Sequence, residues 1–342
     1  MRYSNLINIG SSRPALHSMM STLTLEQWHE EISAAHERIK PWIRRTPLEH
    51  SGVLSELYMA NIYIKLESEQ LTGSFKIRGV FSKLFQLQEQ DVIDKKKGPI
   101  VASTGNHALA FNYALKVLRL KGTTYVTDTI STVKEATLRH VGADLVKYGH
   151  DCVDCEIAAR TAAKEEERSY ISPYNDADVI AGQGTIGKEI YEDLQGVDVV
   201  FVPVGGGGLI SGIAAYLKAV KPSVQALMSK VMYECVKAGK IMFEESKPTL
   251  SDGTSGGVEQ QSVTFDLCHD LIDDWVLVEE DQIANAVHFM VEHHHKIVEG
   301  AAGVSLAALM KVASKYQNKN LVVVASGANI GIDVLKMILN RK

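Results

Sequence analysis

The stretch Val199-Val-Phe-Val-Pro-Val204 is an apolar, largely β-branched run that leads through four glycines, Gly205 to Gly208, into a helical pattern over Leu209 to Val220. An apolar run, a turn of small residues and a helix predict one strand and helix of a mainly parallel α/β sheet. The same unit occurs at Pro99 to His107 before Ala108 to Leu118, and at Leu321 to Asn329 before Gly331 to Leu339. Ligands of such sheets bind beyond the carboxyl ends of the strands, so the three turns predict one shared pocket.

The remaining patterns predict two domains. The segments Thr123 to Asp128, Thr132 to His140 and Ala143 to Tyr148 indicate a strand, a helix and a strand. We expect them in a small domain of residues 98–172, and a large domain made of residues 23–97 and 173–342. A helix is predicted over Leu25 to Ile39, because Thr24 and Gln27 fit a capping box. Residues 1–22 contain no acidic residue and are expected to form a disordered extension.

Composition excludes several classes of function. The 342 residues are 45% hydrophobic, and 41 acidic and 36 basic residues are mixed along the chain to give a net charge of -5. No basic stripe is available to follow a nucleic-acid backbone, so nucleic acid is not an expected partner. No apolar run is long enough to span a bilayer. Four cysteines do not make a disulfide framework, which favours a reducing compartment and predicts a cytoplasmic protein.

The four glycines are the strongest local signal for a ligand. Glycines between a strand and a helix let backbone N–H groups approach a phosphate without an intervening side chain. A merely flexible turn is the alternative, but ordering four glycines costs conformational entropy, and a simple connecting turn does not require four of them. No Lys-Ser or Lys-Thr pair follows, so the nucleoside-triphosphate loop pattern fails. The formal dinucleotide pattern Gly182, Gly184, Gly187 follows a poor strand and is discounted.

Lys76 lies in the segment Leu71-Thr-Gly-Ser-Phe-Lys-Ile-Arg-Gly79, among apolar and small residues. A lysine near apolar walls and a second cation, here Arg78, loses its proton more easily and then serves as a nucleophile or base. A single lysine, taken alone, is more often a surface charge.

Several motifs in this order resemble one family. Ser74-Phe-Lys-Ile-Arg-Gly79 resembles the Schiff-base motif of pyridoxal 5'-phosphate (PLP) enzymes with the tryptophan-synthase β-subunit fold, specifically the threonine dehydratase and serine racemase group. The resemblance continues through Ser103 to His107, Ala181 to Ile186, the four glycines and Ser326 to Asn329, over nearly the whole chain after the first two dozen residues. It implies a fold type II enzyme: two open, twisted, mainly parallel sheets flanked by helices, with PLP between a large and a small domain.

The resemblance also implies a role for individual residues. Lys76 would hold PLP as a Schiff base and then move the Cα proton of the substrate, and Phe75 would pack near the cofactor. Asn106 would bind the 3'-oxygen of PLP, and Ser326 would face its pyridine nitrogen. The phosphate would be bound by Gly205, Gly206, Gly207, Gly208 and Leu209, and the substrate carboxylate by Ser103, Thr104, Asn106 and His107.

A serine beside the pyridine nitrogen favours one type of reaction. A neutral hydroxyl does not keep that nitrogen protonated as a carboxylate would, so the ring is a weaker electron sink. A long-lived carbanion is then disfavoured. Ser326 therefore suits β-elimination, in which a hydroxyl leaves as the Cα proton is removed.

Thr104 departs from the family pattern. Dehydratases often have alanine at this position, and serine racemases have a serine that works on the face opposite the lysine. The Thr104 hydroxyl either only binds the substrate carboxylate, which we favour, or delivers a proton from that face. The surrounding Ser103 to His107 and Ser172 to Asp176 resemble most closely the dehydratase branch associated with hydroxyectoine utilisation.

The metal segment of serine racemase-like members also differs here. Those members bind Mg²⁺ or Ca²⁺ through a Glu after the strand that follows Lys-Pro-Ser-Val. The segment Lys221 to Val231 is several residues too short and has no acid before Glu234, so no metal site is expected. The shortening also puts full activity in question.

Four other features carry less weight. Consecutive histidines, His293 to His295, point in different directions on a helix and cannot easily share one ion. Cys152 and Cys155 have redox-motif spacing but indicate a helix face. Glu299 matches a family position near the PLP ring, although a helix-start charge is equally compatible. Residues 247–257 border the cofactor in the family, while their composition indicates only a turn.

The sequence therefore predicts a PLP-dependent ammonia-lyase, acting as a homodimer on a small-molecule amino acid. It would eliminate water from L-threonine, L-serine or a related β-hydroxy amino acid to give a 2-oxo acid and ammonia. The alternative within the family is an amino-acid racemase. The alternative from another class is a catalytically impaired regulator that binds PLP or an amino acid.

Overall fold

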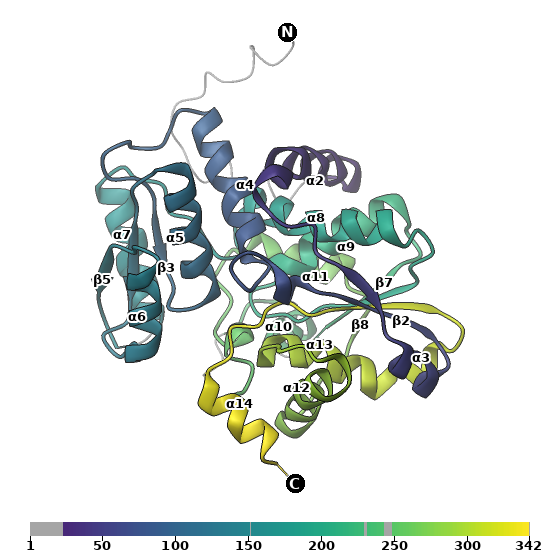
Figure 1. Ribbon diagram of the computed structural model, residues 1–342. Helices are drawn as coiled ribbons and strands as arrows, with labels where there is room; N and C mark the ends of the chain where they lie inside the picture. The colour runs from purple at the N-terminus through teal and green to yellow at the C-terminus, as the bar shows by residue number, and fades with distance from the viewer. Residues whose placement is uncertain (1–22, 151, 229–230, 243–247, 342) are drawn as a thin grey trace.

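The computed structural model describes residues 23–150, 152–228, 231–242 and 248–341. The predicted extension at residues 1–22 lies outside these described residues. Two open sheets, each with its own helices, form the described part of the chain (Figure 1). This arrangement confirms the predicted pair of mainly parallel sheets, whereas the domain boundaries at residues 98 and 172 stay a prediction.

The larger sheet has six strands in the order β1-β2-β9-β6-β7-β8. β1 runs antiparallel to β2, and the other neighbours are parallel. The strands are β1 (Leu48–His50), β2 (Asn61–Lys65), β6 (Val199–Phe201), β7 (Gln225–Met228), β8 (Asp274–Trp275) and β9 (Asn320–Val324). β6 and β9 lie side by side at the centre, which places the glycine turn after β6 beside the Ser326 turn after β9.

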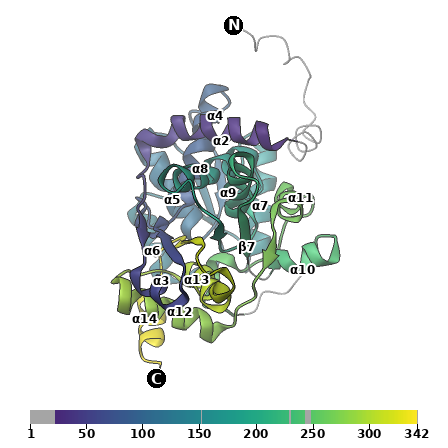
Figure 2. The ribbon, with the colours of Figure 1, turned by 90° about the vertical axis from the view of Figure 1, so that its right-hand side faces the viewer.

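Helices cover both faces of this sheet. Val199 and Phe201 of β6 pack into one core and Val200 into the other, as the alternation of side chains along a strand requires. Figure 2 shows α2, α8 and α9 on one face and α3, α12, α13 and α14 on the opposite face. The helices of this unit are α2 (Leu25–Ile39), α3 (Gly52–Tyr58), α4 (Lys76–Glu89), α8 (Ala177–Asp193), α9 (Gly208–Val220), α10 (Val231–Ala238), α11 (Val263–Leu271), α12 (Glu280–His294), α13 (Gly300–Val312) and α14 (Ile332–Leu339), with short 3-10 turns η1 (Lys40–Trp42), η2 (Glu67–Glu69), η3 (Asp252–Thr254) and η4 (Ala313–Tyr316).

The smaller sheet is parallel, with the strand order β3-β4-β5. Its strands are β3 (Ile100–Ala102), β4 (Thr123–Val126) and β5 (Leu145–Lys147), and its helices are α5 (Asn106–Leu118), α6 (Thr132–His140) and α7 (Cys152–Glu165). One buried cluster joins α5 to α4, with Phe111 packed among Val80, Phe81 and Leu84. The helix that begins at Lys76 therefore lies between the two sheets.

Glycines of α8 let three helices pack closely. A Cβ added at Gly182 would lie 2.6 Å from the carbonyl oxygen of Arg78 on α4, and one added at Gly184 would lie 2.6 Å from Ile32 on α2. Gly182, Gly184 and Gly187 lie inside a helix, not in a turn after a strand. The dinucleotide interpretation is therefore rejected, and these glycines serve helix packing.

Local sequence signals match most element boundaries. Thr24 and Gln27 form the predicted capping box before α2, and α6 covers the predicted residues. Cys152 begins α7, which confirms the helical interpretation of that segment. β6 ends at Phe201, earlier than predicted, because Pro203 has no N–H group to continue the ladder. Within the described residues, no helix is both long and apolar enough to cross a membrane.

Candidate functional site

Lys76 is the first residue of α4, and its amino group is directed into the protein. Its Nζ donates a hydrogen bond to the carbonyl oxygen of Pro173 (2.9 Å). Burial lowers the pKa of Lys76 to about 8, and the negative charge of Glu299 opposes this shift. A lysine with this pKa has an appreciable neutral fraction near neutral pH, which a nucleophile or base requires.

The expectation that Arg78 lowers this pKa is wrong. The guanidinium of Arg78 is fully buried and pairs with two carboxylates, Glu67 (2.8 Å) and Glu189 (2.7 Å). Glu189 also accepts from Lys65 (2.5 Å), and Thr46 donates to Glu67. The charges of this buried network cancel, and desolvation is the cause of the lysine shift. Arg78 instead anchors the first turn of α4 to η2 and α8.

The four glycines connect β6 to α9, as predicted. The N–H groups of Gly205 to Gly208 and of Leu209 have no hydrogen-bond acceptor within the described part of the chain. Gly207 has a φ of 87°, a conformation that favours glycine. A Cβ at Gly206 would lie 2.4 Å from the ring of Tyr174, so packing against the protein is a second reason for glycine here. Unpaired N–H groups at a helix start are suited to a phosphate.

A second helix start lies at Ser103 to His107, between β3 and α5. The Ser103 hydroxyl accepts from the N–H of Gly105 (3.2 Å). Among the described residues, no acceptor lies within reach of the N–H groups of Thr104, Asn106 and His107, nor is Thr104 Oγ1 hydrogen bonded. N–H groups of this kind at a helix start are suited to an anion, and the predicted contact with a substrate carboxylate stays a prediction.

The ring of His107 has a structural contact. Its Nε2 lies 3.0 Å from the carbonyl oxygen of Ile171, which can only accept, so Nε2 carries the proton. Burial, followed by the charge of Lys76, lowers the pKa of His107 to about 3. The ring is therefore neutral, and only the backbone N–H of His107 can serve an anion.

The third turn places Ser326 against the lysine segment. The Ser326 carbonyl accepts from the N–H of Phe75 (3.1 Å), and Ser74 forms a bridge with Gly327. Ser326 is buried, and its hydroxyl has no hydrogen-bond partner in the part of the chain that the structure describes. A buried unpaired hydroxyl is costly in a core and is typical of a ligand site.

Glu299 joins these turns, and the sequence left its role open. It occupies the N-cap position of α13, but its side chain makes no capping bond. The carboxylate accepts from Asn106 Nδ2 (2.9 and 3.0 Å) and from the N–H of Asn329 (3.2 Å), while Asn329 Nδ2 donates to Asn106 Oδ1 (2.6 Å). Burial, with a smaller contribution from Asp252, raises the pKa of Glu299 to about 7. The site interpretation of Glu299 is therefore favoured over the helix-start one.

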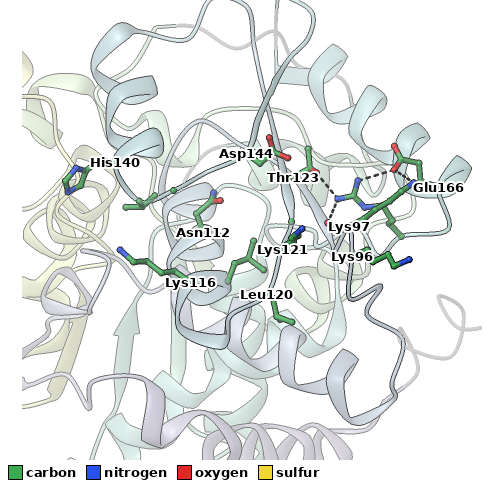
Figure 3. A pocket seen from close by; sticks show the side chains of 15 residues that line it. Lys96, Lys97, Asn112, Lys116, Leu120, Lys121, Thr123, His140, Asp144 and Glu166 are labelled. Carbon is green, nitrogen blue, oxygen red and sulfur yellow. Dashed lines mark hydrogen bonds and ion pairs between the residues drawn. The ribbon is translucent and has the colours of Figure 1, made fainter.

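A separate hollow of about 740 Å³ lies away from these turns (Figure 3). It is lined by residues at the amino ends of the small-sheet strands, such as Thr123 and Asp144, and at the ends of α5 and α6. Its lysines include Lys116 near the end of α5, where cations are common because they favour the helix dipole. It contains none of the predicted site residues.

Within the described residues, the site consists of a desolvated lysine, two helix starts with unpaired N–H groups and a buried hydroxyl without a partner, which together fit PLP. The model of the family described as pyridoxal-phosphate dependent enzyme matches residues 39–327. The chain belongs to this family. PLP is thus the cofactor of this pyridoxal-phosphate dependent enzyme.

Relatives and solved structures of the family resemble the chain over most of its length. The L-threonine ammonia-lyase of Thermotoga maritima is 36% identical over 317 residues, covering 91% of this chain and 78% of the relative. The catabolic L-threonine dehydratase of Staphylococcus aureus is 36% identical over 325 residues, covering 91% and 93%. Threonine deaminase isoform 2 of Solanum lycopersicum has a TM-score of 0.85 at 32% identity and 92% coverage of both chains. Maize serine racemase has a TM-score of 0.84 at 28% identity, covering 90% and 95%.

Proposed function

We propose that this PLP-dependent enzyme is an ammonia-lyase that eliminates water from L-threonine, L-serine or a related β-hydroxy amino acid, giving a 2-oxo acid and ammonia. One observation carries the proposal: the desolvated amino group of Lys76 belongs to a site with the buried Ser326 hydroxyl, to which no carboxylate of the described residues is hydrogen bonded. The names of two relatives, L-threonine ammonia-lyase and L-threonine dehydratase, support it.

The proposed PLP site uses residues from both sheets. Lys76 would hold the cofactor, with Phe75 beside it, and Asn106 would bind the 3'-oxygen. Ser326 would meet the pyridine nitrogen with its unpaired hydroxyl. The N–H groups of Gly205, Gly206, Gly207, Gly208 and Leu209 would bind the phosphate at the start of α9. PLP, when bound, supplies the electron sink for the electrons released at Cα.

Residues of the chain then bind the substrate carboxylate and move the Cα proton. The N–H groups of Thr104, Asn106 and His107, with the Ser103 hydroxyl, hold the carboxylate at the start of α5. Lys76 Nζ, with its pKa lowered to about 8, takes the Cα proton. Burial raises the pKa of Glu299 to about 7, and the negative charge of this carboxylate, when ionised, favours the protonated form of Lys76.

Asn106 has enough donors for this role. Its Nδ2 carries two hydrogens, so one bond to Glu299 can persist while the other hydrogen meets the 3'-oxygen. Asn329 holds the Oδ1 atom of Asn106 and so fixes which end of the amide faces the site. The proposed orientation thus requires no rotation of the side chain.

A racemase is the second candidate, and Thr104 is the observation that favours it. In the described residues, the Thr104 hydroxyl has no hydrogen-bond partner, so it is available to a ligand. We favour carboxylate binding for this hydroxyl, while proton delivery from the face opposite Lys76 would support racemisation. Serine racemase of maize and a PLP-dependent aspartate racemase share the fold, with TM-scores of 0.84 and 0.83.

We further infer a cytoplasmic homodimer that uses no divalent cation and binds neither nucleic acid nor membrane. Mixed charge, only four cysteines and the short segment at Lys221 to Val231 support the compartment and the absence of a cation and of nucleic acid, and the resemblance supports the dimer. Assignment to the hydroxyectoine branch stays a prediction.

The test is the visible spectrum of the purified protein with PLP, before and after L-serine, L-threonine and threo-3-hydroxyaspartate. Release of 2-oxo acid and formation of the enantiomer are assayed together. A cofactor band with oxo-acid release is expected. Enantiomer without oxo acid would replace the lyase by a racemase, and a band that responds to no amino acid would favour the impaired regulator.

A further inference from the structure

The short segment of residues 172–175 contacts both the lysine and the phosphate turn of the proposed cofactor site. Pro173 accepts the hydrogen bond of Lys76 Nζ (2.9 Å). The next residue, Tyr174, packs on the glycine turn so closely that a Cβ at Gly206 would lie 2.4 Å from its ring and one at Gly208 would lie 2.9 Å from its Cα. The position of residues 172–175 therefore sets the spacing between the lysine and the phosphate turn.

Glu259 holds this segment at three points. Its carboxylate accepts from Asn175 Nδ2 (3.0 Å) and from the Ser172 hydroxyl (3.4 Å). Its backbone N–H donates to the Tyr174 hydroxyl (2.9 Å). Asn175 Oδ1 in turn accepts from the N–H of Val263, the first residue of α11, so the segment and α11 are fixed together.

Glu259 also forms an ion pair with a residue of the small-sheet unit. Arg160 on α7 pairs with the Glu259 carboxylate (2.6 Å) and lies over the Tyr170 ring, 4.2 Å from its centroid. Arg160 pairs with a second carboxylate, Glu156, one helical turn away (2.8 Å). Burial raises the pKa of Glu259, and Arg160 opposes this shift. The carboxylate thus lies where α7 meets the segment that supports Lys76.

We propose that Glu259 is a positioning residue for the cofactor site, which holds residues 172–175 so that the carbonyl of Pro173 and the ring of Tyr174 set Lys76 and the glycine turn at the spacing PLP requires. Glu259 is not among the residues assigned to PLP or substrate and acts through this segment. Small displacements of such supports reduce rates because the reacting groups lose their alignment. The inference rests on the cofactor site proposed above and is independent of which amino acid reacts.

Arg160 pairs with two carboxylates, so substitution of the second one is a matched control for substitution of Glu259. Glu259→Gln and Glu156→Gln each remove one negative charge beside Arg160, but only Glu259 contacts residues 172–175. The amide introduced by Glu259→Gln would present a donor where Ser172, Asn175 and Arg160 all donate. Tyr174→Phe removes only the acceptor for the Glu259 N–H and keeps the ring on the glycine turn.

The measurement is the rate of PLP release from each purified holoenzyme, without substrate, followed by the loss of the visible band while free PLP is trapped. We expect Glu259→Gln to release PLP on the order of tenfold faster, Tyr174→Phe to change in the same direction, and Glu156→Gln to stay within about twofold of the unmodified enzyme. Turnover on the accepted amino acid is expected to fall in parallel, with KM nearly unchanged.

Two outcomes would overturn the proposal. One is a release rate for Glu259→Gln equal to that of the unmodified enzyme. The other is an equal acceleration in Glu156→Gln, which would assign the effect to the loss of a carboxylate beside Arg160. If Glu259→Gln does not fold, Tyr174→Phe decides, and an unchanged release rate there would also refute the role. Because release is measured without substrate, failure of the proposed lyase activity would leave this test intact.

Discussion

Glu299→Gln should remove a pH dependence of stability that the buried Glu299 carboxyl gives the unmodified protein. Burial raises the pKa of Glu299 to about 7 from an ordinary value of 4.5, which corresponds to about 3 kcal/mol. Because the folded-state pKa is raised, the protonated carboxyl stabilises the folded protein fully below about pH 4.5. This stabilisation is lost as the pH rises through about 7. Glutamine stays neutral and keeps an oxygen for Asn106.

The assay is equilibrium urea unfolding of PLP-free protein at about pH 5.5 and about pH 7.5. Over this interval the free energy of unfolding of the unmodified protein should fall by about 2 kcal/mol more than that of Glu299→Gln. The interval lies below the pKa of Lys76, which is lowered to about 8. Glu292→Gln, at an exposed position, serves as the control. The same pH dependence in Glu299→Gln and in the unmodified protein would refute the assignment of a desolvated carboxyl.

Other substitutions test the glycine turn, the buried ion pairs of Arg78 and the role of Thr104. Gly206→Ala places a Cβ 2.4 Å from the ring of Tyr174 and should lower the free energy of unfolding, measured with urea, by about 1–3 kcal/mol. The control is Gly257→Ala, whose Cβ has no atom within 4 Å and should leave the free energy of unfolding nearly unchanged. Arg78→Met leaves the buried Glu67 carboxylate without a cation and Glu189 with Lys65 as its cation, and it should cost about 3–5 kcal/mol in the same assay. An effect as small as that of the exposed Arg45→Met, under about 1 kcal/mol, would contradict this. Thr104→Ala should retain elimination in a 2-oxo acid assay. Loss of elimination with unchanged racemisation would count against proton delivery by this residue.

Local signals in the sequence predicted the elements well. The capping box at Thr24 and the strand-turn-helix units depend on residues within a few positions of one another, and the structure confirms them. Strand ends were less predictable, because a strand ends where its pairing ends. β6, for example, pairs with β9 only through Phe201.

The cause of the Lys76 shift could not be read from the sequence. Arg78 is two residues from the lysine, so proximity along the chain suggested a direct effect. Its carboxylate partners, Glu67 and Glu189, lie 11 and 111 residues away, and only folding brings them to the guanidinium. Desolvation depends on the same long-range packing.

Glu259 was missed for a related reason. It lies in a glycine-bearing stretch whose composition indicates a turn, and its partners Asn175 and Arg160 belong to other elements. The pattern "Gly-Gly-Val-Glu" carries no local signal for a partly buried hydrogen-bond acceptor. The Glu299 carboxylate was noticed because of its family position, but its contact with Asn106 emerged from the fold.

The central claim is that Lys76 carries PLP. Borohydride reduction of the purified holoenzyme fixes the cofactor to its lysine, and peptide mass spectrometry then locates the pyridoxyl group. The account predicts this group on Lys76, and Lys76→Ala should lose both the modification and the visible band. A pyridoxyl group on another lysine, such as the buried Lys65, or a visible band that persists in Lys76→Ala, would contradict it.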